Sequence, residues 1–167
     1  MWRSGRSRLR PSQGKLILNP APMILYPCGA FTMNRIDGLE EAFRDARVVF
    51  LSTFDGDKEN TRQMTNFNES PYGEIWFPTE KGTRKIKDIQ SNPRVLVTFP
   101  AQTEGEFYEI EGMAALADQG FVDRKWRWWY LYWRPSQKRR FWFTPLSDDR
   151  RAIITVKPVE ARLVERS

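Results

Sequence analysis

Short runs rich in β-branched and aromatic residues, separated by turn signals, are the feature that most restricts what this chain can fold into. Such runs favour strands, because branched and aromatic side chains pack well on a pleated surface. Two of the runs flank Asp55–Lys58, a sequence typical of a tight hairpin turn. The predicted strands are Arg47–Phe54, Thr61–Phe67, Glu74–Thr79, Arg94–Phe99, Phe107–Ala117, Ala152–Lys157 and Val159–Val164. Strands of similar length, joined mostly as hairpins, predict a mainly β fold with a few helices, a small closed or split β-barrel.

Three segments between the strands have the pattern of helices. Asp37–Asp45 has apolar residues at helical spacing and predicts a short amphipathic helix. A second helix opens on Thr83 and must end before Pro93, because proline lacks a backbone donor and disfavours helix in the residue before it. The third predicted helix is Phe121–Trp133. Gly112, inside a predicted strand, indicates a bulge or a close approach of another segment.

The positive charge of the chain is concentrated in its first 32 residues. The whole sequence of 167 residues has a formal net charge of +6, and residues 1–32 hold five basic residues and no acidic one. The remainder is close to neutral, so long-range attraction of nucleic acid is not expected of it. We predict that residues 1–32 are a disordered or loosely attached tail, either a basic anchoring arm or an extension ahead of a natural start at Met33. Residues 33–167 are then one folded domain.

The chain has no histidine, and Cys28 is its only cysteine. These two facts exclude a Ser-His-Asp or Cys-His catalytic site, a Cys/His zinc site and an intrachain disulfide. No metal site is expected. The apolar runs are too short for a transmembrane helix or a secretory leader. We therefore expect a reducing, cytoplasmic location.

The turn and helix that follow Thr79 carry the most specific chemical pattern. This stretch, W-F-P-T-E-K-G-T-R-K-I-K-D-I-Q-S-N-P-R, opens its helix on Thr83, Arg84 and Lys85. A helix N-terminus presents unpaired amide N–H groups and a positive dipole end, so a hydroxyl and two cations there can form a phosphate site. The same residue types are common on ordinary solvated helices. The local pattern alone leaves both interpretations open.

The sequence around this helix resembles the signature of the pyridoxamine 5'-phosphate oxidase-like FMN-binding split barrels, in the general stress protein subgroup. The residues that carry the resemblance are Gly82, Thr83, Arg84, Lys85, Ile86, Ile89, Asn92, Pro93, Arg94 and Val95. The likeness extends from about Ile36 to Val164 and is strongest between Arg62 and Gly112. It implies an FMN-binding split barrel, as a homodimer that builds its flavin sites at the subunit interface.

The resemblance also implies which residues hold the cofactor. Those expected to contact the FMN phosphate are Arg62, Thr79, Thr83, Arg84 and Lys85. The backbone of Gln63, Met64 and Thr65 is expected to edge the isoalloxazine ring. No residue is implied as catalytic.

Departures from the family's true oxidases limit the expected activity. Phe67 stands where those enzymes carry a lysine for the substrate phosphate, and Phe107 stands where they have a glutamine that approaches the flavin. Without histidine, their C-terminal Arg-x-His motif cannot be present. Oxidation of pyridoxamine phosphate is therefore not expected. The resemblance implies an FMN flavoprotein, with electron or hydride transfer to an unidentified substrate, and FMN is not distinguished from a phosphate-bearing deazaflavin.

Residues 121–143 have the most unusual composition in the chain, with five of its seven tryptophans and seven cations. Bases stack on tryptophan, and interfacial helices combine tryptophan with basic residues, so the segment suits a single-stranded nucleic-acid or membrane-surface element. It suits equally a helix whose aromatic face covers the barrel or a subunit partner; that face is Trp126, Trp129, Tyr130 and Trp133. We favour the covering helix, and some of its rings are candidates to wall a pocket beside the flavin. A non-enzymatic nucleic-acid- or protein-binding module is the alternative to a flavoprotein.

Overall fold

The strands of this chain form one antiparallel sheet. The computed structural model describes residues 33–133 and 150–165, with the backbone alone for 127–133. The described residues fall within one compact unit, 31–167. The strands are β1 (Val48–Asp55), β2 (Lys58–Thr65), β3 (Ile75–Glu80), β4 (Arg94–Pro100), β5 (Glu106–Leu116) and β6 (Arg151–Glu165). Their order in the sheet is β2-β1-β4-β5-β6-β3, and each pair of neighbours is antiparallel.

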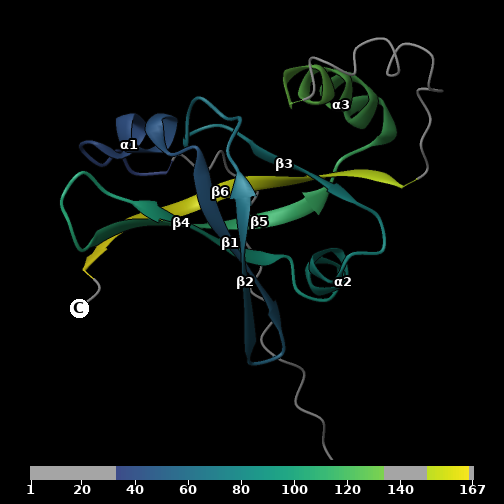
Figure 1. Cartoon of the computed structure of the whole chain (residues 1–167). Coiled ribbons are helices and arrows are strands. Elements are labelled where there is room, and N and C mark those ends of the chain that lie inside the picture. Colours follow the sequence, from purple (N-terminus) through teal and green to yellow (C-terminus); the bar gives the residue numbers. More distant parts are fainter. Residues whose placement is uncertain (1–32, 134–149, 166–167) are drawn as a thin grey trace, which may run out of the picture. The chain divides into compact units, whose positions relative to one another are not determined.

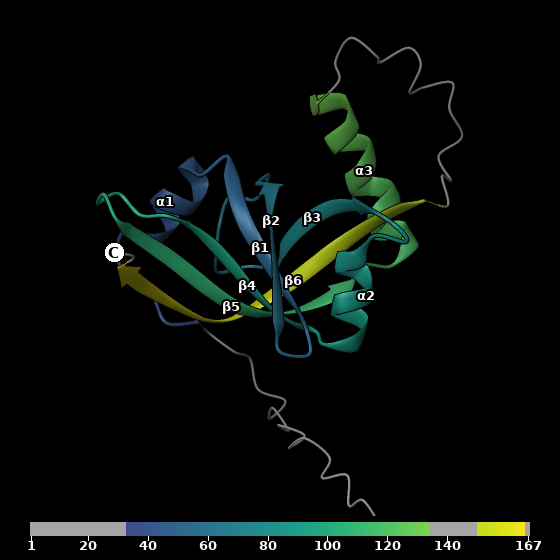
Figure 2. The same ribbon diagram turned by 60° about the horizontal axis from the view of Figure 1, so that its bottom comes forward.

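The sheet curls so strongly that its two edge strands, β2 and β3, lie near each other at one end (Figures 1 and 2). Asn68 links these ends. Its Nδ2 donates to the carbonyl of Trp76 at 3.1 Å, and its Oδ1 accepts from the Trp76 amide at 2.9 Å. The result is a half-barrel, which confirms the predicted mainly β fold of the split-barrel type.

The first hairpin forms at the predicted turn. Asp55 pairs with Lys58, and Gly56 adopts a positive φ of 60°, a conformation that glycine adopts without steric cost. Because the loop holds only two residues, β2 begins at Lys58. It ends at Thr65. The predicted strand, Thr61–Phe67, therefore lies a few residues too far toward the C-terminus.

The two C-terminal strands predicted on either side of Pro158 are one continuous strand, so that prediction was wrong. The register between β5 and β6 shifts at Gly112, which leaves Val159 as an extra residue in β6. Such a bulge tolerates a proline, because the ladder is already interrupted there. The close approach expected at Gly112 is confirmed. A Cβ at this position would lie 2.6 Å from Val156 Cγ1 and 2.8 Å from the carbonyl oxygen of Lys157.

Three described helices lie on the sheet (Figures 1 and 2). They are α1 (Leu39–Asp45), α2 (Arg84–Ser91) and α3 (Gln119–Trp133), and all three were predicted. Ile86 and Ile89 of α2 are buried, and Ile89 packs into the main core. None of the helices in the described ranges is long and apolar enough to cross a membrane. The predicted tail, residues 1–32, lies outside those ranges.

Strand β3 separates two apolar clusters, because its side chains alternate between the faces of the sheet. Ile75 and Phe77 point into the main core, where both are fully buried. Trp76 points the other way and packs with Ile153 beneath α3. One face of this strand therefore belongs to the interior of the half-barrel, and the other supports α3.

Candidate functional site

Arg62 lies on the face of β2 that points into the half-barrel. It pairs with Leu51 of β1, and Met64, two residues on, pairs with Val49. Leu51 and Val49 are fully buried. The side chain of Arg62 is only 24% exposed, since this face is mostly covered. A guanidinium held at the edge of a core is costly to desolvate and needs anionic partners.

Asp88 of α2 is the buried carboxylate that gathers the cations around it. Its side chain is 3% exposed. It accepts hydrogen bonds from Thr53 Oγ1 at 2.7 Å and Asn60 Nδ2 at 3.3 Å. Its Oδ2 lies 3.5 Å from Arg62 Nη2, and its Oδ1 lies 4.0 Å from Arg84 Nε. One carboxylate thus links α2 to the hairpin of β1 and β2.

Asp88 stays ionised despite its burial. Burial alone would raise the pKa of its carboxyl group. The Thr53 hydroxyl, the Arg62 guanidinium and the Asn60 amide beside the carboxylate outweigh burial and lower that pKa below its ordinary value. The cluster therefore contains a permanent negative charge at neutral pH.

The other two cations come from the first turn of α2. Arg84 is largely exposed and also contacts Asp55, with Nη2 3.3 Å from Oδ2. Lys85 is half-buried, and its Nζ lies 3.8 Å from Met64 Sδ. Burial, followed by the charge of Arg62, lowers the pKa of Lys85. An anion bound nearby opposes both effects, since it stabilises the protonated lysine.

Two polar atoms of this cluster are buried and have no hydrogen-bond partner among the described residues: Arg62 Nη1 and Thr83 Oγ1. Thr83 is the N-cap residue of α2, yet its side chain makes no capping hydrogen bond. Buried polar atoms in native proteins are almost always paired. A phosphate group offers oxygens that could accept from both donors, and the first amides of α2 lie at a helix end that favours anions. The donor set therefore fits a phosphate.

The structure thus brings four of the predicted phosphate contacts to the start of α2 and the hairpin beside it: Arg62, Thr83, Arg84 and Lys85. Thr79 lies near the end of β3, where it is buried and pairs with Ala152 of β6. In the ranges that the structure describes, no hydrogen bond or ion pair joins Thr79 to these cations. Gln63 lies on the opposite face of β2 and is exposed.

Asp88, Thr53 and Asn60 were missed by the sequence reasoning. The spacing of Asp88 four residues after Arg84 is a signal for an ion pair on one helix face. Thr53 and Asn60 have no such signal, because they become neighbours only through the hairpin register.

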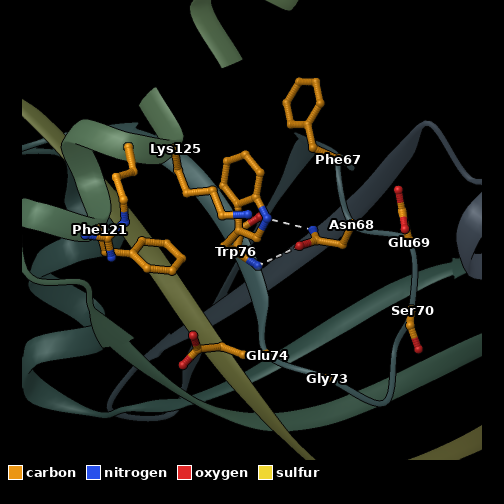
Figure 3. Close-up of a pocket in the computed structure, with 10 residues that line it drawn as sticks. Phe67, Asn68, Glu69, Ser70, Gly73, Glu74, Trp76, Phe121 and Lys125 are labelled. Carbon is orange, nitrogen blue, oxygen red and sulfur yellow. Dashed lines mark hydrogen bonds between the residues drawn. The ribbon is translucent and has the colours of Figure 1, made fainter. Parts of the chain in front are cut away.

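A cavity of about 770 Å³ lies between α3 and the loop that joins β2 to β3 (Figure 3). On the loop side, the ring of Phe67 stacks on Trp76 with centroids 6.0 Å apart. From α3, Lys125 Nζ lies 5.1 Å from the ring centroid of Trp76 and 5.9 Å from that of Phe121. The cavity thus combines aromatic walls with a cation, and Glu69 completes its loop side.

A second cavity, of about 630 Å³, lies on the outer face of the sheet. Its lining comes from β1, β2, β4 and β5: Phe50, Ser52, Glu59, Thr61, Thr98 and Phe107. Gln63 pairs with Phe50, so the edge of β2 predicted to meet the flavin ring borders this cavity. Phe107, at the position where the family's oxidases carry a glutamine, also lines it.

The comparisons with known proteins agree with this architecture. The family model for proteins described as "Pyridoxamine 5'-phosphate oxidase like" matches residues 34–163. General stress protein 26 of Bacillus subtilis (strain 168) is 28% identical over 122 residues, which cover 71% of this chain and 79% of that protein.

Two solved structures are similar in fold. The general stress FMN/FAD binding protein from Xanthomonas citri has a TM-score of 0.56 and 22% identity, over 78% of this chain and 89% of that one. An F420 reductase has a TM-score of 0.55 and 17% identity, over 77% of this chain and 98% of that one. At these identities the structures show a shared fold.

Proposed function

Because this chain belongs to the pyridoxamine 5'-phosphate oxidase-like family, we propose that it binds FMN through the cluster at the start of α2 and acts as a flavin-dependent oxidoreductase. The observation that carries the proposal is the pair of unused buried donors, Arg62 Nη1 and Thr83 Oγ1. Together with Arg84 and Lys85 they supply hydrogen bonds and positive charge suited to a phosphate monoester. Thr79 and the backbone of residues 63–65 complete the proposed contacts.

The roles of the chain's own residues follow from their chemistry. Arg62 offers a planar fork that matches phosphate oxygens, whereas Lys85 offers a point charge. Thr83 donates a hydrogen bond from its hydroxyl group. When bound, FMN supplies the electron or hydride transfer, and the protein contributes binding, orientation and electrostatics. No residue of the described cluster is assigned a proton-transfer role.

The ring is proposed to lie along the edge of β2, toward the outer-face cavity that Phe107 lines. That cavity is open on the surface of one chain, and a second copy packed on it would enclose the ring. We therefore include a homodimer, with the flavin at its interface, in the proposal. A cytoplasmic location is also part of it, in keeping with the single cysteine of the chain.

Oxidation of pyridoxamine phosphate is not part of the proposal. Phe67, at the position of the oxidases' substrate-binding lysine, stacks on Trp76 and has no charge to offer a second phosphate. The substrate is instead proposed to be planar or apolar, in keeping with Phe50 and Phe107 in the outer-face cavity where the ring is proposed to lie.

A flavin titration tests the proposal. FMN is added to the purified protein, and the fluorescence of the flavin is followed. Riboflavin, which lacks the phosphate, is the comparison ligand. We expect FMN to bind and riboflavin to bind much more weakly. A phosphate-bearing deazaflavin in the same panel distinguishes the two cofactor classes, since an F420 reductase shares the fold. Equal affinity for FMN and riboflavin would contradict the phosphate site.

The alternative of a nucleic-acid- or protein-binding module has no observation in its favour among the described side chains. Val122 and Trp126 of α3 are buried against Trp76 and Ile153. This part of the aromatic helix covers the sheet, as the favoured interpretation expects. The side chains of Trp129, Tyr130 and Trp133, and residues 134–143, lie outside the described residues.

A further inference from the structure

Asp88 places a buried negative charge among the cations of the proposed phosphate site. Its carboxylate lies 3.5 Å from Arg62 Nη2 and 4.0 Å from Arg84 Nε. Those are the same positive charges that a phosphate would use. A carboxylate fixed at this point competes with the ligand for them and also repels the ligand directly.

The carboxylate has shorter contacts with the sheet than with the cations. Its shortest hydrogen bonds come from neutral donors on the hairpin, Thr53 Oγ1 at 2.7 Å and Asn60 Nδ2 at 3.3 Å. The separations from the two guanidinium groups exceed the roughly 2.7–2.9 Å of a charge-assisted hydrogen bond. Asp88 can therefore stay in place when Arg62 and Arg84 contact a ligand.

Without Asp88, the positive charges of the cluster would lie close together in the ligand-free protein with no buried negative charge to balance them. The positive charge of Arg62 already contributes to lowering the pKa of its half-buried neighbour Lys85. A fixed carboxylate beside Arg62 reduces this repulsion. Asp88 thus stabilises the ligand-free cluster and lowers the gain from filling it.

We propose that Asp88 is a resident counter-ion that weakens the binding of phosphate dianions at this site, so that the flavin is held exchangeably. This inference rests on the proposed function, because it concerns the same site. The inference assigns Asp88 a role in setting the affinity of the site for FMN. Asp88 limits the positive charge available to the ligand, while Arg62, Thr83, Arg84 and Lys85 make the contacts.

The test compares FMN binding by the wild-type protein and by Asp88→Asn. Asparagine keeps the shape of the side chain and an oxygen that accepts from Thr53, but it removes the charge. We expect FMN to bind roughly tenfold more tightly to this variant, because a unit charge a few ångströms from a dianion costs about that much even under strong screening. Dissociation of FMN should slow by a similar factor, and riboflavin affinity should not change.

Asp55→Asn is the matched control. It removes the same formal charge from a residue that also contacts Arg84, but Asp55 is 57% exposed and is not buried among the cations. Exposed charges are screened by water and salt, so we expect its FMN affinity to change by less than about twofold. The pair of variants separates a buried counter-ion from a general change in net charge.

The outcomes are distinct. If wild-type protein binds FMN and Asp88→Asn binds it equally or more weakly, the counter-ion inference is overturned while the proposed function stands. Equal tightening toward riboflavin would also overturn it, because riboflavin has no phosphate for Asp88 to repel. A wild-type protein that does not bind FMN would overturn the proposed function and this inference with it. Should Asp88→Asn fail to fold, Asp88→Ser removes the charge with a shorter polar side chain and is expected to show the same tightening.

Discussion

Arg62 and Asp88 form an ion pair that occupies only one end of the guanidinium group, with Arg62 Nη2 3.5 Å from Asp88 Oδ2. The other end, Nη1, is buried and has no hydrogen-bond partner in the part of the chain that the structure describes. The carboxylate therefore orients the arginine and leaves a donor for a ligand. This arrangement joins β2 to α2 at the point where the cations of the cluster meet.

Replacing Arg62 with lysine tests whether FMN binding needs the planar guanidinium group or only its positive charge. Lysine keeps the positive charge but cannot hold Asp88 with one nitrogen and present a second nitrogen to a phosphate. We expect Arg62→Lys to weaken FMN binding about tenfold or more and to leave riboflavin binding unchanged, as measured by fluorescence titration. The control is Arg44→Lys, at an exposed arginine of α1. Unchanged FMN affinity in Arg62→Lys would remove Arg62 from the site.

Thr83→Val separates ligand binding from stability. The hydroxyl of Thr83 is buried, has no hydrogen-bond partner within residues 33–133 and 150–165, and does not cap α2. Valine has nearly the same shape, so the ligand-free variant should be as stable as the wild type or slightly more stable, because an unsatisfied polar atom is removed. FMN affinity should fall about fivefold or more with the loss of one hydrogen bond to the phosphate.

Thermal unfolding with and without FMN measures both effects in one experiment. The melting temperature of ligand-free Thr83→Val should match that of the wild type, and the increase on adding FMN should be smaller. A clear loss of stability in the ligand-free variant would show that the hydroxyl has a structural partner instead.

Arg84→Ala should weaken FMN binding substantially and leave the fold intact. Arg84 is 59% exposed, and its contacts with Asp55 and Asp88 are long, so its removal should change the free energy of unfolding by less than about 1 kcal/mol. Loss of a charge-assisted bond to phosphate costs about 1.5–3 kcal/mol of binding energy. Arg44→Ala, at an exposed arginine remote from the cluster, is the matched control in the same titration. Equal FMN affinity in the two variants would contradict the role of Arg84.

The fold could be predicted where local chemistry determines it. The β-branched runs gave strands, and the Asp-Gly turn gave the first hairpin, because both depend on neighbouring residues. The continuity of β6 through Pro158 could not be predicted in this way. It depends on a bulge opposite Gly112, and a bulge is a property of the register between two strands.

The candidate site, too, could be predicted only in part from the sequence. The resemblance carried by the residues around Thr83–Lys85 is confirmed at the level of the family. It supplied Arg62 as a distant member of the cluster, and the structure places Arg62 near Arg84 through their shared contact with Asp88. The hydrogen bonds from Thr53 and Asn60 could not be foreseen, since they require both the hairpin register and the packing of α2 on it.

The lowered pKa of Asp88 predicts how the protein responds to acid. A carboxyl group whose pKa is lower in the folded state stabilises the fold above its ordinary pKa of 3.8, and this stability is lost as pH falls through the lower folded value. Wild-type protein should therefore lose stability below about pH 4. Asp88→Asn lacks this contribution, so it should be less stable than the wild type at pH 6, with a smaller difference near pH 2.

Urea unfolding at the two pH values measures this change. Asp55→Asn, which removes an exposed carboxylate, should have the same stability as the wild type at both pH values. A stability difference between wild type and Asp88→Asn that is the same at both pH values would show that the ionisation of Asp88 does not contribute.

Gly112→Ala tests the close packing of β5 against β6. A Cβ at this position would lie 2.6 Å from Val156 Cγ1 and 2.8 Å from the carbonyl oxygen of Lys157, and the second contact is with backbone that cannot rotate away. We expect a loss of about 1–3 kcal/mol in the free energy of unfolding, the usual cost of overpacking. Gly112 does not have a positive φ, so this loss measures the steric contact rather than backbone strain. Gly73→Ala is the control, because nothing lies within 4 Å of its added Cβ. Equal stability of the two variants in urea would mean that the strands separate at the bulge without cost.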